Sequence, residues 1–229
     1  MNNLKPANQT QLFGLENYFK ELVLLENRGK LPNKILLSGQ KGLGKSTLSY
    51  HFINYVLSKN EEFNYDLNDF TINPENKSFK TINNKTCPNF ILVDINEQKK
   101  TIDIDQIREL ISKLNKSSLN EKPRFILIDN IEYLNKNSIN ALLKILEEPT
   151  INVFFILINN NKNILSTLLS RCINFKISMT YDESSAVINQ LLLGKMNKII
   201  SKNLINYYST PGNLYKLAEF ANSNNYDIS

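Results

Sequence analysis

The chain has 229 residues, a formal net charge of +5, and a composition that is 41% hydrophobic and 10% aromatic, which suits a globular protein of one or two domains. A single histidine and two cysteines exclude multi-histidine and four-cysteine metal centres and disfavour a Ser-His-Asp hydrolase. No apolar run is long enough to span a bilayer and the first eleven residues are polar, so we expect a cytoplasmic protein with no membrane partner. The remaining chemistry belongs to backbone amides, lysine, arginine and carboxylates, which is typical of phosphate handling.

Helical and strand patterns alternate over the first two thirds of the chain. Helices show apolar residues at spacings of three and four, whereas strands buried on both faces show short continuous apolar runs. Alternation of this kind predicts an α/β fold with a parallel sheet. In chain order the predicted elements are helix 15–27, strand 35–37, helix 45–58, strand 90–93, helix 103–115, strand 125–128, helix 137–147 and strand 153–158.

Two regions depart from this alternation. Residues 59–88 are polar, rich in Asn and Lys, and weakly periodic, which fits either a mobile loop or a reduced folded module. From residue 180 onward the strand patterns stop, and helices are predicted over 181–193, 196–208 and 213–222. We therefore predict a nucleotide-binding α/β domain over 1–178, with 59–88 as a variable insertion, and a small all-helical domain over 179–229.

A glycine-rich motif follows the first predicted strand and opens the next helix. It matches the P-loop pattern G-x-x-x-x-G-K-[ST], in which backbone amides and a helix N-terminus bind phosphate oxygens. Lys45 is expected to reach the terminal phosphates, and the Ser46 hydroxyl is expected to bind Mg²⁺. The predicted nucleotide-binding residues are Gly39, Gln40, Lys41, Gly42, Leu43, Gly44, Lys45, Ser46 and Thr47.

A second acidic position completes the predicted site. The apolar run 125–128 ends in Asp129, which is expected to hold Mg²⁺ through water, opposite Ser46. Hydrolytic P-loop proteins usually place Glu directly after this Asp, but here Asn130 follows and cannot act as a base. Glu132 could replace that Glu only if the loop turned it inward. The sequence therefore predicts ATP binding with weak intrinsic ATPase activity.

Four segments together resemble the bacterial clamp-loader subunits of the AAA+ class, most closely the delta-prime branch within DNA polymerase III. The resemblance covers roughly residues 10–220. Its most specific part is the string Asn-Ala-Leu-Leu-Lys-Ile-Leu-Glu-Glu-Pro, followed by Ser-Arg-Cys. The four segments are residues 29–39, 140–149, 154–160 and 165–172.

The resemblance implies roles for further residues and for partners. Arg171 matches the arginine finger that reaches the nucleotide of a neighbouring subunit, a role suited to a permanently charged bidentate guanidinium. Asn159 matches sensor 1, which orients water near the γ-phosphate, and Asn160 is its close rival. The implied cofactors are ATP and Mg²⁺. The implied partners are other clamp-loader subunits in a hetero-oligomeric ring, the sliding clamp, and primed DNA held through non-specific backbone contacts.

The chain also departs from this family. Many relatives carry four zinc-binding cysteines in the segment equivalent to 59–88, but only Cys87 is present here, so no zinc is expected. In motor-type relatives the small all-helical domain, here 179–229 and called the lid, carries a sensor 2 arginine. The matching residue here is Tyr215, with Lys216 adjacent, so sensor 2 is expected to be missing. Relatives continue into a C-terminal collar domain, which we expect to be absent from this sequence.

Three functions follow as hypotheses. The first is a delta-prime-like subunit that binds ATP, supplies Arg171 in trans and helps to load the sliding clamp on primed DNA during DNA replication. The second is a hydrolytically active motor similar to gamma/tau, which the intact Lys45, Ser46 and Asp129 support. The third is a scaffold that keeps a vestigial P-loop as a folding element.

Overall fold

The computed structural model describes residues 4–96, 99–116, 120–148, 151–194, 199–201, 203–204, 210–224, 226 and 228. Within these ranges, none of the helices combines the length and the apolar character that crossing a membrane requires. Both cysteines, Cys87 and Cys172, are free thiols.

A five-stranded parallel sheet forms the centre of the molecule, with strand order β2-β3-β4-β1-β5. The four predicted strands are confirmed, and a fifth strand that the sequence pattern did not indicate lies at the edge beside β1. This parallel arrangement brings the carboxyl ends of β1, β3 and β4 to the same edge. The strands are β1 Lys34–Ser38, β2 Phe90–Val93, β3 Arg124–Ile128, β4 Val153–Asn159 and β5 Ile173–Lys176.

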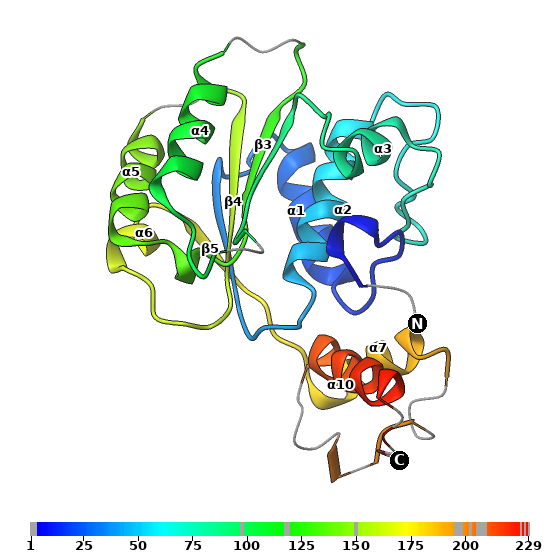
Figure 1. Ribbon diagram of the computed structural model, residues 1–229. Helices are drawn as coiled ribbons and strands as arrows, with labels where there is room; N and C mark the ends of the chain where they lie inside the picture. The colour runs from blue at the N-terminus through cyan, green and yellow to red at the C-terminus, as the bar shows by residue number, and fades with distance from the viewer. Residues whose placement is uncertain are drawn as a thin grey trace.

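Helices cover both faces of the sheet (Figure 1). On one face α1 (Glu16–Asn27) and α2 (Lys45–Ser58) pack over one set of strand side chains, including Leu37, Leu127 and Ile158. The alternate side chains, including Leu36, Ile126 and Leu157, pack under α4 (Ile104–Leu114), α5 (Lys136–Glu147) and α6 (Ser166–Leu169). The continuous apolar runs in the sequence are explained by this burial on both faces.

Side-chain caps fix the starts of α4 and α5. The Asp103 carboxylate accepts a hydrogen bond from the Gln106 N–H, and the Gln106 side chain accepts one from the Asp103 N–H. Asn135 accepts from the Ser138 N–H at 2.9 Å and so begins α5. Such caps satisfy the free amides of the first helical turn and hold each helix in register with the sheet.

Residues 59–88 form a folded module against α2, which settles the choice that the sequence left open. Tyr65, Ile72 and Ile82 are buried in the same apolar cluster as α1 and α2. The side chain of Asn76, which is fully buried, accepts hydrogen bonds from the Phe79 N–H and the Asn54 amide and donates to the Phe63 carbonyl. The module contains one helix, α3 (Lys77–Asn83).

The C-terminal part is helical and has its own apolar cluster. Helix α7 (Tyr181–Leu191) packs against α10 (Pro211–Ser223) through residues that include Ile188, Leu214 and Ala218. Figure 1 shows this pair grouped apart from the sheet. The predicted helix 196–208 falls largely outside the described residues, and the division of the chain at 178/179 stays a prediction.

Candidate functional site

The predicted phosphate loop lies between β1 and α2 with the backbone conformation that its glycines permit. Gly42 and Gly44 have φ values of 92° and 84°, a region that side chains with a Cβ rarely adopt. Gly44 is also the N-cap of α2, so the loop leads directly into a helix N-terminus. The first-turn amides of α2 and its dipole therefore face the loop as an anion-binding surface.

Lys45, in the first turn of α2, is folded back over the loop. Its Nζ donates hydrogen bonds to the carbonyl oxygens of Gly39 at 2.8 Å and Gln40 at 2.7 Å. Burial lowers the pKa of Lys45 to about 8, while the negative charges of Asp129 and Glu132 act in the opposite direction. The ammonium group is thus held at the loop by carbonyl oxygens, and no carboxylate of the described residues forms an ion pair with it.

Asp129 lies at the carboxyl end of β3 and meets the first turn of α2. Its carboxylate is hydrogen-bonded by the Ser46 side chain and, at 2.8 Å, by the Asn130 N–H. Burial and the nearby charge of Asp94 raise the pKa of Asp129 to about 6, although both hydrogen bonds and Lys45 favour ionisation. A buried carboxylate beside a hydroxyl and a second negative charge has the electrostatics of a cation site.

A chain of polar side chains continues from Asp129 along the edge of the sheet. Asn130 has a φ of 57°, and its Nδ2 donates to the Asp94 carboxylate at 2.8 Å. Asn160 Nδ2 donates to Asn130 Oδ1 at 2.8 Å and to Glu132 Oε1 at 3.1 Å. Glu132, in the short helix η2 (Ile131–Tyr133), is thereby fixed by the end of β4. The sequence analysis missed Asp94, whose position directly after the strand 90–93 was the available signal.

The two asparagines at the end of β4 have different surroundings. The Asn159 side chain is buried and donates to the Lys162 carbonyl at 2.9 Å, so it closes the turn after the strand. Asn160, in contrast, lines the cavity beside the phosphate loop. The structure therefore places the rival candidate, and not Asn159, next to Asn130 and Glu132. The sensor role of either residue stays a prediction.

A cavity of about 330 Å³ lies over the phosphate loop. Four parts of the chain enclose it: the N-terminal segment before α1, the loop residues 41–47 with Asp129 and Asn130, the end of β4 with Ile158 and Asn160, and the helices α7 and α10. Its apolar lining includes Leu12, Leu15 and Val187, and both Tyr215 and Lys216 border it. The volume falls within the range of small-molecule sites and combines an apolar wall with a few polar groups.

Helix α10 touches the phosphate loop directly. The Gly212 N–H donates to the Gly42 carbonyl at 2.9 Å, and the Thr210 hydroxyl donates to the Lys41 carbonyl at 3.0 Å. A Cβ on Gly212 would lie 2.8 Å from both Cα and O of Gly42. The start of α10 thus contacts the phosphate loop through the backbone atoms of Gly212 and Gly42.

Arg171 does not line this cavity. It follows α6, forms an ion pair with Glu147 of α5, and donates from Nη1 to the Thr167 carbonyl at 2.7 Å. Its side chain is 30% exposed and that of Glu147 is 56% exposed. Arg171 therefore does not contribute to the cavity over the phosphate loop, and its role as an arginine finger stays a prediction.

The residues over the phosphate loop fit a nucleoside triphosphate with Mg²⁺. The loop offers amides in a positive-φ turn, the buried Lys45 offers a charge, and Ser46 and Asp129 are already in contact. Among the described residues there is no group of three or more His, Cys, Asp or Glu side chains placed to hold a metal by themselves.

The family model described as "DNA polymerase III, delta subunit" matches residues 14–180, which is more than half of the chain. The chain belongs to this family. A curated relative, DNA polymerase III subunit delta' of Buchnera aphidicola subsp. Schizaphis graminum, is 30% identical over 168 residues, which cover 73% of this chain and 49% of that protein.

A further curated relative and a solved structure are also similar to the chain. DNA polymerase III subunit gamma/tau of Mycoplasma genitalium is 30% identical over 202 residues, covering 88% of this chain and 31% of that protein. Among solved structures, the Thermotoga maritima RuvB Holliday junction branch migration motor matches with a TM-score of 0.53 and 20% identity, over 98% of this chain and 70% of that one. The structural match confirms the predicted α/β fold with a parallel sheet. The chain spans about half the length, or less, of the curated relatives that it matches.

Proposed function

We propose that the chain is a delta-prime-like clamp-loader subunit that binds ATP with Mg²⁺ and presents Arg171 to a neighbouring subunit. One observation carries the nucleotide part: the positive-φ glycine loop, Lys45 and the Ser46–Asp129 contact meet at one end of the sheet. The family match supports the clamp-loader part. The proposed partners are the other loader subunits, the sliding clamp, and primed DNA held through non-specific backbone contacts.

The loop amides, Lys45, Ser46 and Asp129 have separate roles in the proposed binding of ATP and Mg²⁺. Bound ATP and Mg²⁺ would supply the phosphate charge and the cation that the site is shaped to hold. The loop amides and Lys45 neutralise phosphate oxygens, and Lys45 exchanges its bonds to the Gly39 and Gln40 carbonyls for bonds to phosphate. Ser46 and Asp129 hold the cation, Asp129 through water. The apolar wall near Leu12 and Val187 covers the base.

Weak hydrolysis is part of the proposal because of the residue after Asp129. Asn130 has no proton-accepting carboxylate, and its side chain is already engaged by Asp94 and Asn160. The alternative is an active gamma/tau-like motor, and the position of Glu132 supports it. Its carboxylate is fixed by Asn160, which itself lines the cavity. Relatives named delta' and relatives named gamma both match the chain, so the choice depends on measured turnover.

Nucleotide binding is tested by titrating the chain with a fluorescent ATP analogue in the presence of Mg²⁺. We expect Lys45→Ala to weaken binding at least about tenfold because it removes the charge nearest the phosphates. The control is Lys30→Ala, which removes an exposed lysine away from the cavity.

Two results would overturn parts of this proposal. Failure of the unmodified chain to bind at millimolar nucleotide would favour the scaffold with a vestigial P-loop. Steady ATP turnover by the isolated chain that disappears in Lys45→Ala would favour the gamma/tau-like motor.

A further inference from the structure

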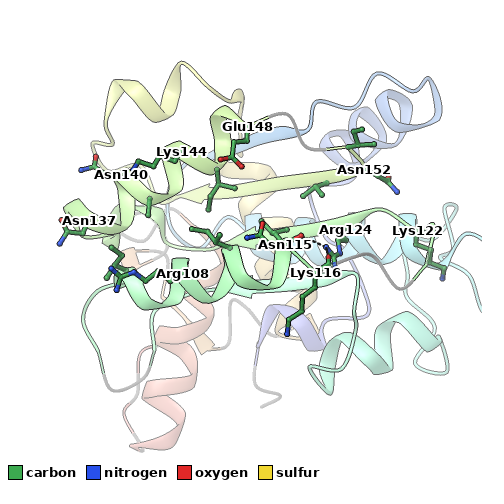
Figure 2. Close-up of a pocket in the computed structure, with 17 residues that line it drawn as sticks. Arg108, Asn115, Lys116, Lys122, Arg124, Asn137, Asn140, Lys144, Glu148 and Asn152 are labelled. Atoms are coloured by element: carbon green, nitrogen blue, oxygen red, sulfur yellow. Dashed lines mark hydrogen bonds between the residues drawn. The ribbon is translucent and has the colours of Figure 1, made fainter.

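A second cavity, of about 770 Å³, lies between α4 and α5, on the face of the sheet opposite α1 and α2 (Figure 2). None of the residues that line it belongs to the cavity over the phosphate loop. We call it the α4–α5 groove. It is independent of the nucleotide site, and the proposed function assigns it no role.

The floor of the groove is apolar. Helix α4 uses Ile107 and Leu110, which are fully buried, to pack on the sheet. Its other apolar side chains, Ile104, Ile111 and Leu114, are only half-buried and line the groove. Ala141 and Ile145 line it from α5, and Ile151 at its end is 94% exposed. Ile111 and Leu114 pack against the core cluster with part of their surface, so the parts of these side chains and of Ile104 that stay exposed are what a partner in the groove would cover.

The rim of the groove is positively charged. Its lining contains one carboxylate, Glu148, against five cationic side chains. Figure 2 shows the polar groups of α4 and α5 along opposite sides, with Lys122, Arg124 and Asn152 at the end where β3 and β4 begin. The cationic residues of the lining are Arg108, Lys116, Lys122, Arg124 and Lys144.

These five cations are not equally available to a partner. Lys122 donates to the Leu57 carbonyl and pairs with Glu61, and Arg124 donates to the carbonyls of Leu114 and Lys116 at the end of α4. Among the described residues Arg108 pairs with Asp105, one helical turn away, in an exposed contact that stabilises little. The side chains of Arg108, Lys116 and Lys144 are exposed, so they can engage acidic groups laid along the groove.

From this arrangement we infer that the α4–α5 groove docks an acidic amphipathic helix of a partner protein. Helix α4 has 11 residues, or about 16 Å, so the groove accepts roughly three helical turns. Apolar side chains of the partner at i, i+4 and i+7 fill the floor, and its carboxylates face Arg108, Lys116 and Lys144. A nucleic-acid backbone fits less well, because it has no aliphatic groups for the floor, and two of the five cations are bound to the chain's own oxygens.

The test measures binding of the full 229-residue chain to defined labelled peptides by fluorescence anisotropy. The probe is a helical peptide of about 14 residues, with Leu on one face at helical spacing and Glu on its flanks. A matched probe carries Lys in place of Glu. We expect micromolar binding of the Glu peptide, weaker binding at higher salt, and at least about tenfold weaker binding of the Lys peptide.

Charge reversal locates the binding on the groove. The double variant Arg108→Glu/Lys144→Glu is expected to weaken binding of the Glu peptide at least about tenfold and to strengthen binding of the Lys peptide. Its control, Lys113→Glu/Lys136→Glu, makes the same change in net charge on the same two helices but at positions outside the groove lining. Thermal unfolding of each variant establishes that it is folded.

Several outcomes overturn the inference. Equal loss of binding in the control variant would place the peptide elsewhere or reduce the effect to net charge. If the Glu peptide does not bind while a duplex of about 20 base pairs does, and the double variant abolishes that binding, the groove is a phosphate-backbone surface. If sedimentation shows a dimer that the double variant dissociates, a second copy of the chain occupies the groove.

Discussion

His51, the only histidine in the chain, lies on α2 with no exposed surface. Its Nδ1 is 2.9 Å from the Tyr65 hydroxyl, and the two rings pack edge to face. The residue therefore joins α2 to the module 59–88 as a packing residue. Burial lowers the pKa of His51 to about 4, so the folded protein holds the ring neutral.

This pKa shift predicts a loss of stability in mild acid. The unfolded chain takes up a proton near the ordinary pKa of 6.5, whereas the folded chain does so only near 4. The stabilisation is complete above pH 6.5 and is lost as pH falls toward 4, by about 2 kcal/mol between pH 7 and pH 4.5. Asp129 acts in the opposite sense, because its raised pKa makes the folded state take up its proton first.

Denaturant unfolding of the wild-type chain and of His51→Phe at both pH values separates the two effects. Asp129 contributes equally to both proteins, so the difference between them reports His51. We expect the wild type to lose about 2 kcal/mol more than the variant on acidification. Parallel pH dependences would show that His51 is not kept neutral by folding.

At the scale of elements, the contact between α10 and the phosphate loop has no room for a side chain. A methyl group on Gly212 would lie within 2.8 Å of the Gly42 backbone, so Gly212→Ala must move the start of α10 away from the loop. We expect a destabilisation of about 1–3 kcal/mol and faster hydrogen–deuterium exchange in residues 40–44 and 210–214. Asn222→Ala, on the exposed end of the same helix, is the control. Unchanged exchange in Gly212→Ala would mean that the lid does not rest on the loop in solution.

The elements also show what the sequence could and could not predict. Strands β1, β3 and β4 and the phosphate loop were predictable because burial on both faces and the loop motif leave local patterns. The edge strand β2 was predictable because all four of its residues are apolar. Strand β5 was missed because only Phe175 of its four residues is even half-buried, and an edge strand needs no apolar run. The module 59–88 depends on buried asparagines with distant partners, such as Asn54 with Asn76. Similarly, the difference between Asn159 and Asn160 depends on where β4 ends, which spacing alone did not resolve.

At the scale of the whole molecule, the candidate functional features lie apart from one another. The phosphate loop and lid enclose one cavity, and the α4–α5 groove occupies the opposite face of the sheet. Arg171 belongs to neither lining and is tied to Glu147. In the described part of the chain the candidate nucleotide site and Arg171 therefore lie apart. The proposed action of Arg171 on a neighbouring subunit depends on this separation.

Reconstitution with the partner subunits gives the prediction for Arg171. If its guanidinium completes a neighbour's site, Arg171→Ala leaves the fluorescent ATP analogue bound to this chain with unchanged affinity. It lowers the ATPase rate of the assembled complex by about 10³-fold, the loss typical of an arginine finger. Arg171→Lys keeps the charge but not the paired donors, so it is expected to recover little of the rate. Arg28→Ala removes an exposed arginine of α1's end and should change neither measurement. A complex that assembles with Arg171→Ala and hydrolyses ATP at the unmodified rate would remove Arg171 from the proposed mechanism.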